Sequence, residues 1–214
     1  MNSPPKSSSG KQISFVFLMI FTFTYLFWAA RQIQENRNEE FLLYISVVGV
    51  VMGVILFLHR RFRFSLLSLW AMSAWGLFHM MGGLFQVPPD WPIAGKKAVL
   101  YNWWMIPHIL KFDQFVHAYG FGITTWIIWQ ALCASLRKRG SRLPSRGGVL
   151  FLCALASMGL GSLNEIIEFF ATLTMAETNV GGYTNTCLDL VSNTVGAFLM
   201  AVILFIGSRK KDAL

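Results

Sequence analysis

Six long apolar stretches decide what this chain of 214 residues can fold into. Each is close to the roughly 20 helical residues that cross a hydrocarbon layer of about 30 Å. Hydrophobic residues form 55% of the chain and charged residues only 13%, a composition that excludes both a water-soluble domain and a disordered chain. We therefore predict an all-α, polytopic transmembrane helical bundle with six spans, at residues 13–30, 41–58, 64–87, 112–136, 148–173 and 187–207.

The basic residues lie mainly on one side of these spans. Of the 18 Lys and Arg residues, 13 fall before the first span, in 59–63, in 137–147 and after the sixth span. The positive-inside rule then places both termini in the cytoplasm, so the net charge of +8 is a topology signal and does not indicate a nucleic-acid partner. The predicted organisation is a disordered cytoplasmic head (1–11), a six-span transmembrane domain (12–208) and a basic cytoplasmic tail (209–214).

Two segments on the opposite, outer side have distinctive compositions. Residues 91–104 include three of the eight Trp residues, which are typical of the boundary between membrane and water. We expect this segment to rest at the depth of the lipid headgroups. Residues 176–186 are expected to be flexible, because Gly181 and Gly182 permit backbone conformations that other residues avoid.

Four of the ten acidic residues fall inside predicted spans or at their edges: Asp113, Glu165, Glu168 and Asp189. Ionisable groups within a membrane are costly, and they therefore indicate function by default. Because neighbouring spans alternate in direction, all four carboxylates are expected at similar depth in the outer half of the bundle. His79, in the outer half of the third span, reaches the same level.

Polar residues in these spans are also paired at helical spacing. Residues three or four apart lie on one face of a helix, so each pair can turn toward a shared cavity. Small residues nearby would let the helices approach closely. The pairs are Asp113/His117, Asn164/Glu168, Glu165/Glu168 and Asp189/Asn193, and the small residues are Gly120, Gly122, Gly159, Gly161 and Gly196.

The charge of this cluster requires compensation. No Lys or Arg lies inside the last three spans at this depth, and four facing carboxylates cannot all stay ionised without a cation. A divalent metal ion, shared protons, or both would resolve the conflict, whereas hydrogen bonds that only fix helix packing are a third interpretation. Carboxylates with an imidazole suit Mg²⁺, Mn²⁺ or Zn²⁺. The predicted metal ligands are His117, Glu165, Glu168 and Asp189, supported by His79, Asn164 and Asn193; for His79 itself, hydrogen bonding is favoured over ligation.

Three segments resemble a known group of membrane proteins. FDQFVHAYGFG (112–122), LNEIIEFF (163–170) and NTCLDLVSNTVGA (185–197) resemble the motifs of the VanZ-like membrane proteins. HMMGG (79–83), the six spans and the length are more similar still to the YjdF-like family of bacterial inner-membrane proteins. This resemblance implies a multi-pass protein of the bacterial cytoplasmic membrane, without a settled activity. It also implies site roles for Asp113, His117, Glu165, Glu168, Asp189 and Asn193.

Three classes of function stay open at this point. The first is a metal-dependent enzyme acting on a lipid or lipid-linked substrate at the outer leaflet, with Asp113, His117 and Glu165 as catalytic residues. In it, Asp113 would orient His117 or act as a general base. The second is a proton- or cation-coupled transporter, which the one-sided position of the polar groups disfavours. The third is a non-enzymatic accessory protein. Membrane lipids are the one partner common to all three classes.

Overall fold

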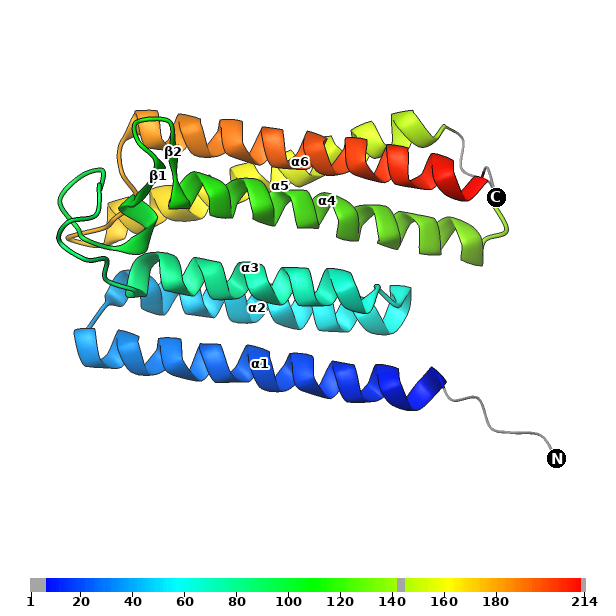
Figure 1. Ribbon diagram of the computed structural model, residues 1–214, viewed down its shortest axis with the longest axis horizontal. Coiled ribbons are helices and arrows are strands. Elements are labelled where there is room, and N and C mark those ends of the chain that lie inside the picture. Colours follow the sequence, from blue (N-terminus) through cyan, green and yellow to red (C-terminus); the bar gives the residue numbers. More distant parts are fainter. Residues whose placement is uncertain (1–6, 142–144, 213–214) are drawn as a thin grey trace.

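Six long helices form the protein, in a computed structural model that describes residues 7–141 and 145–212. The helices run back and forth along one axis, so that the first begins and the last ends at the same end of the bundle (Figure 1). The all-α prediction is confirmed. The helices are α1 (Ser7–Asn36), α2 (Glu39–Phe62), α3 (Leu66–Leu84), α4 (Phe112–Lys138), α5 (Arg146–Thr174) and α6 (Tyr183–Asp212).

The ends of the chain are more helical than the sequence predicts. α1 begins at Ser7, so the part of the expected disordered head that the structure describes is helical, and residues 1–6 lie outside the described residues. α6 continues to Asp212 through most of the expected tail, and 213–214 again lie outside the described residues. Both helices extend beyond their apolar stretches because an established helix propagates more easily than it nucleates.

Four helices are individually long and apolar enough to cross a membrane: α1, α2, α5 and α6. Their exposed surfaces carry large apolar side chains, such as Phe23 at 64% and Phe57 at 69% exposure, which suit contact with lipid. α3 and α4 do not meet the same criterion, although the sequence predicted spans there. Both helices are central, since α3 contacts α1, α2 and α4, and α4 contacts α3, α5 and α6. Neighbouring helices therefore take the place of lipid around them.

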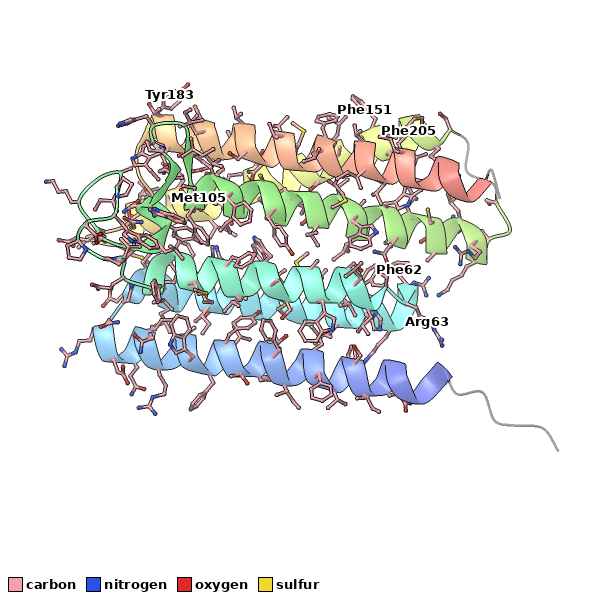
Figure 2. All side chains as sticks on the ribbon, viewed as in Figure 1. Phe62, Arg63, Met105, Phe151, Tyr183 and Phe205 are labelled. Atoms are coloured by element: carbon pink, nitrogen blue, oxygen red, sulfur yellow. The ribbon has the colours of Figure 1, made fainter. Side chains whose placement is uncertain are left out.

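Ordered loops close one end of the bundle, opposite the end at which α1 begins and α6 ends (Figure 1). The segment between α3 and α4 contains a short 3-10 helix, η1 (Leu100–Asn102), and an antiparallel hairpin of β1 (Trp104–Ile106) and β2 (Leu110–Lys111). In Figure 2, Met105 and Tyr183 lie at this end, and Phe62 and Arg63 lie at the other. We call the loop end the outer end, following the predicted topology.

The outer loop is folded rather than extended along the membrane. Isolated bridges join Gln86 to Val99 and Ile93 to Trp103, and the rings of Trp91 and Trp103 lie 4.7 Å apart. The loop is thereby fixed against the outer end of the helices. It brings Tyr101 and Lys111 into the protein interior, where both are buried.

Candidate metal centre at the outer end

Close packing of α4, α5 and α6 brings their polar residues together. A Cβ atom on Gly196 would overlap the backbone of Ala118, and one on Gly161 would lie 2.7 Å from the Asn193 side chain. Gly122 also faces α6, where a Cβ would lie 3.2 Å from the carbonyl oxygen of Gly196. These three glycines permit the close approach expected from the sequence.

The expectation fails for the other two glycines. A Cβ on Gly120 would meet Trp75 of α3, so this residue makes room for a ring on a different helix. Gly159 has no atom within 4 Å of such a Cβ. It lies on the side of α5 that turns away from the other helices, which sequence spacing alone did not reveal.

His117 lies at the centre of the polar cluster and is 8% exposed. Its Nε2 atom lies 3.6 Å from Oδ1 of Asp113, one turn earlier on α4. Its Nδ1 atom lies 3.0 Å from Oδ1 of Asn193 and 3.5 Å from Oε1 of Glu165. Both ring nitrogens therefore face acceptors, and the imidazole connects residues of all three helices.

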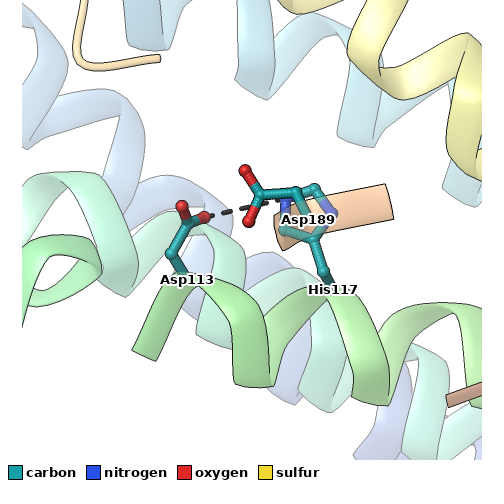
Figure 3. A group of neighbouring side chains, drawn as sticks. All are labelled: Asp113, His117 and Asp189. Atoms are coloured by element: carbon teal, nitrogen blue, oxygen red, sulfur yellow. Dashed lines mark ion pairs between the residues drawn. The ribbon is translucent and has the colours of Figure 1, made fainter. Parts of the chain in front are cut away.

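Asp113 and Asp189 approach each other across α4 and α6. Figure 3 shows their carboxylates turned toward one another beside the His117 ring. Asn185 connects them, because its Nδ2 lies 2.6 Å from Oδ2 of Asp189 and 3.3 Å from Oδ2 of Asp113. Asp189 is 1% exposed, and its other oxygen, Oδ1, has no hydrogen-bond partner among the described residues.

Lys111 supplies a positive charge that the sequence analysis did not expect. It precedes α4, but its side chain turns inward and is buried. Its Nζ atom lies 3.4 Å from Oδ2 of Asp113 and also contacts Oδ1 of Asn185. Its backbone N–H donates to the buried Gln114 side chain at 2.8 Å, which fixes the start of the helix. The view that no basic residue compensates the acids is therefore wrong, although one ammonium does not balance four carboxylates.

Glu165 is the least satisfied member of the cluster. It is 8% exposed, and neither of its carboxylate oxygens accepts a hydrogen bond within the described residues. One turn further along α5, Oε1 of Glu168 accepts a hydrogen bond from Nδ2 of Asn164 at 2.8 Å. A buried carboxylate without donors is unfavourable unless a cation or bound water lies beside it.

Two overlapping groups have the geometry to hold a metal ion. One consists of His117, Glu165 and Glu168, and the other of Asp113, His117 and Asp189. In each, the potential ligand atoms lie within 4.8 Å of one another. The four ligands predicted from the sequence are thus brought into one cluster, but Asp189 groups with Asp113 rather than with the two glutamates.

His79 lies behind the cluster and is in neither metal-binding group. Its Nδ1 atom contacts the Tyr101 hydroxyl, and its ring stacks on Trp75 with centroids 5.5 Å apart. Burial raises the pKa of Tyr101 well above its usual range, so this hydroxyl stays protonated and donates to His79. His79 therefore makes the hydrogen bond that the sequence analysis favoured over ligation.

A small cavity of about 20 Å³ adjoins Asp113, Glu168 and His79. This volume accommodates about one water molecule. Glu40, from the first turn of α2, lies on its far side and accepts hydrogen bonds from the backbone N–H of Asn179 at 2.9 and 3.0 Å. The polar layer therefore extends from α4, α5 and α6 to α2 and to the loop before α6.

Four residues of this layer were missed by the sequence analysis: Lys111, Asn185, Tyr101 and Glu40. Asn185 precedes Asp189 by four residues, the same spacing that identified the other pairs, so this signal was present. Lys111 and Tyr101 come from the loop between α3 and α4, whose path no helical periodicity predicts. Glu40 stands at the edge of the second predicted span, and Tyr44, whose hydroxyl lies 3.5 Å from its Oε1, follows it by four residues, so a signal at helical spacing was present here too.

Comparison with known proteins assigns the chain to a family. Residues 14–210 match the family described as predicted membrane protein (DUF2238). The protein belongs to the DUF2238 family. This assignment supports the YjdF-like resemblance, which refers to the same family, but gives no support to a VanZ-like relationship. No curated protein and no solved structure matches the chain.

Proposed function

We propose that this DUF2238 protein is a metal-dependent enzyme of the bacterial cytoplasmic membrane that acts on a lipid or lipid-linked substrate at the outer face. The observation that carries the proposal is the buried carboxylate of Glu165 beside His117 and Glu168, whose oxygens accept no hydrogen bond from the part of the chain that the structure describes. A divalent ion in this group would satisfy both oxygens of Glu165 at once. Mg²⁺, Mn²⁺ and Zn²⁺ all accept oxygen ligands of this kind.

Charge balance favours a metal ion over proton sharing alone. If ionised, Asp113, Glu165, Glu168 and Asp189 carry four negative charges, against one positive charge on Lys111. A divalent ion reduces the remaining excess to one. A proton on His117 leaves it at two, and any further proton would have to be shared among the carboxylates themselves. The donors of Lys111 and Asn185 are directed to Asp113 and Asp189, so the glutamate group has the greater need of a cation.

The two ring nitrogens of His117 can take different roles. In the tautomer that carries its proton on Nε2, this N–H can donate to Asp113. Nδ1, which faces Glu165, then has a free lone pair that can bind the ion in place of its contact with Asn193. A carboxylate that accepts from the free nitrogen of a histidine ligand fixes its orientation and increases its basicity. Asp113 is accordingly the residue that positions His117, and it reaches toward the outer opening through Lys111 and Asn185.

A bound divalent ion would supply Lewis acidity and an activated water molecule. The residues around it would orient a substrate carbonyl or phosphoryl group and accept a proton. Glu168 adjoins the water-sized cavity and is placed to accept a proton from water there. Ester or phosphoester hydrolysis is the reaction class that these groups serve best.

Transport is the weaker alternative for a specific reason. Asp, Glu, Lys, Arg and His are absent from 118–136 of α4, 147–164 of α5 and 190–207 of α6. These ranges separate the cluster from the other end of the bundle. A proton relay across the membrane requires ionisable groups along its length. The cluster instead opens toward one side only, as an enzyme site at one leaflet does.

Elemental analysis of the detergent-purified protein tests the proposal. The wild-type protein, purified with Mg²⁺, Mn²⁺ and Zn²⁺ present, is expected to retain about one divalent ion per chain, as one closed ligand set would. Glu168→Gln is expected to lower the affinity at least about tenfold, since even residues that only support ligands contribute about that much. Glu35→Gln is the control, because Glu35 is an exposed acid at the outer end of α1.

A wild-type protein without any divalent ion would reject the metal site. If the ion is present, incubation with mixed phospholipid vesicles and mass spectrometry of the lipids would test the reaction. Hydrolysed products are expected with the wild-type protein and not with Glu165→Gln. Metal-containing wild-type protein that leaves every lipid class intact would contradict the hydrolysis of membrane lipids.

A further inference from the structure

A cavity of about 670 Å³ lies at the outer end of the bundle, above the acidic cluster. We call it the vestibule. Its walls are formed by residues 94–97 of the outer loop and 176–179 of the loop before α6, together with Asn102, Lys111 and Asn185. It is large enough for a lipid headgroup or a group of similar size.

The vestibule is positively charged, unlike the cluster below it. Three lysines line it, Lys96, Lys97 and Lys111, and the one acidic lining residue is Glu177. Lys96 and Lys97 are exposed, and within the described residues neither ammonium lies within ion-pair distance of a carboxylate. Both lysines line the cavity and are therefore available to an anion that enters it.

The floor of the vestibule connects this positive region to the site. Lys111 and Asn185 line the cavity and also contact Asp113. Asn185 donates to Asp189 as well. An anion that attracts the Lys111 ammonium would thus lie directly over the carboxylates and within reach of an ion held by them.

The height of the vestibule indicates which anion it meets. The same outer loop carries Trp91, Trp103 and Trp104, residues that are typical of the headgroup region of a bilayer. Phosphate is the common anionic group at that depth. Lysine ammonium groups bind phosphate as compact point charges.

We propose that the vestibule binds the phosphate group of the substrate, with Lys96 and Lys97 at its rim and Lys111 at its floor. This inference rests on the proposed lipid-directed function and gives the substrate class of the same site, a phosphorylated lipid or another phosphorylated compound. The lysines hold the phosphate group while the reacting bond lies toward His117, Glu165 and Glu168.

Native mass spectrometry of the detergent-purified, full-length protein tests the inference. The probes are dioctanoyl phosphatidic acid, dioctanoylglycerol, which lacks the phosphate, and inorganic phosphate as competitor. The double variant Lys96→Gln/Lys97→Gln is expected to bind phosphatidic acid roughly tenfold to thirtyfold more weakly than the wild type, as expected for two basic groups near an anionic lipid. Arg31→Gln/Arg37→Gln is the control, because it removes two charges from the outer end outside the vestibule.

Competition with inorganic phosphate distinguishes a lipid phosphate from a soluble one. Binding of phosphatidic acid that inorganic phosphate does not displace assigns a lipid phosphate, whereas equal binding of inorganic phosphate assigns a soluble one. Equal retention of dioctanoylglycerol and phosphatidic acid would overturn the inference. So would unchanged affinity in the lysine double variant, or an equal loss in the arginine control.

Metal content measured on the same samples separates the two proposals. The lysine double variant is expected to retain the wild-type amount of divalent ion, since neither lysine contacts the carboxylates. Lysine-dependent phosphate binding by a wild-type protein without metal would reject the metal site and leave the vestibule standing. Bound metal in a protein that shows no lysine-dependent phosphate binding would reject the vestibule proposal and leave the metal site standing.

Discussion

The two halves of the bundle are packed by different means. The half formed by α1, α2 and α3 buries large side chains, among them Tyr25, Phe41, Tyr44 and Met80. The half formed by α4, α5 and α6 packs through small residues and keeps its helices close enough for their polar side chains to meet. Close helix packing and a polar site therefore occur together, while the aromatic half forms a wall behind the site.

The difference in packing explains why the acids converge where they do. The polar residues grouped around His117 come from the closely packed half: Asp113, Glu165, Glu168, Asp189 and Asn193. From the other half, His79, Tyr44 and Glu40 line the small cavity that adjoins this group. Aromatic side chains hold helices too far apart for short carboxylates to share one ion. The three predictions below change one half at a time, from the largest expected effect to the smallest.

The Gly196→Ala substitution tests the close packing of α4 and α6. The added methyl group overlaps the backbone of Ala118, which cannot move without separating the helices. The expected cost is about 3 kcal/mol of unfolding free energy, together with loss of bound metal. Thermal unfolding in detergent and elemental analysis measure both effects.

Gly159→Ala is the matched control for this substitution, because open space surrounds that position. It is expected to leave stability unchanged or slightly increased, since Ala favours the helix. Similar losses in the two variants would show that the contact of Gly196 does not matter specifically.

The Glu165→Gln substitution tests the charge of the same half, and its effect is expected to change sign with the metal. Without metal, removal of a buried charge that lacks donors is expected to stabilise the protein by roughly 1–3 kcal/mol. With metal present, the variant loses a ligand and is expected to be less stable than the wild type. Thermal unfolding of both proteins with excess chelator, and again with added Zn²⁺ or Mn²⁺, measures the reversal. A variant less stable under both conditions would indicate that Glu165 has a purely structural role.

The Tyr101→Phe substitution tests the wall formed by the aromatic half. It removes the hydroxyl that contacts His79 but keeps the ring in its packed position. We expect a loss of about 1 kcal/mol, because the buried Nδ1 atom of His79 is left without a partner. Chemical unfolding in mixed micelles measures this, and Tyr183→Phe serves as control, since Tyr183 is 86% exposed at the same end of the bundle. If the Tyr101→Phe variant is as stable as the wild type, water replaces the hydroxyl.

Much of the fold could be predicted from hydrophobicity alone, since a membrane requires long apolar helices and the chain contains little else. The six helices and their order follow from the apolar stretches. The apolarity of a stretch does not show how much of the helix faces lipid. α3 and α4 are shielded by neighbouring helices and need not be strongly apolar. Apolarity records contact with lipid, and central helices have little such contact.

The part of the candidate site that lies on helices could be predicted from the sequence. Spacing of three or four residues identified Asp113, His117, Glu165, Glu168 and Asp189, which the structure places in one cluster. Lys111 could not be placed, because it lies in a hairpin whose inward turn depends on tertiary packing. Residues contributed by loops depend on contacts distant in sequence, and these contacts leave no periodic pattern.

The stretch without ionisable side chains in α4, α5 and α6 separates the cluster from the opposite end of the bundle, which the predicted topology places in the cytoplasm. Under the proposed function, an ion bound by Glu165, Glu168 and His117 would enter from the vestibule, past Lys111. Occupancy would then follow the metal supply and acidity of the extracytoplasmic compartment, whatever the cell's internal metal pools contain.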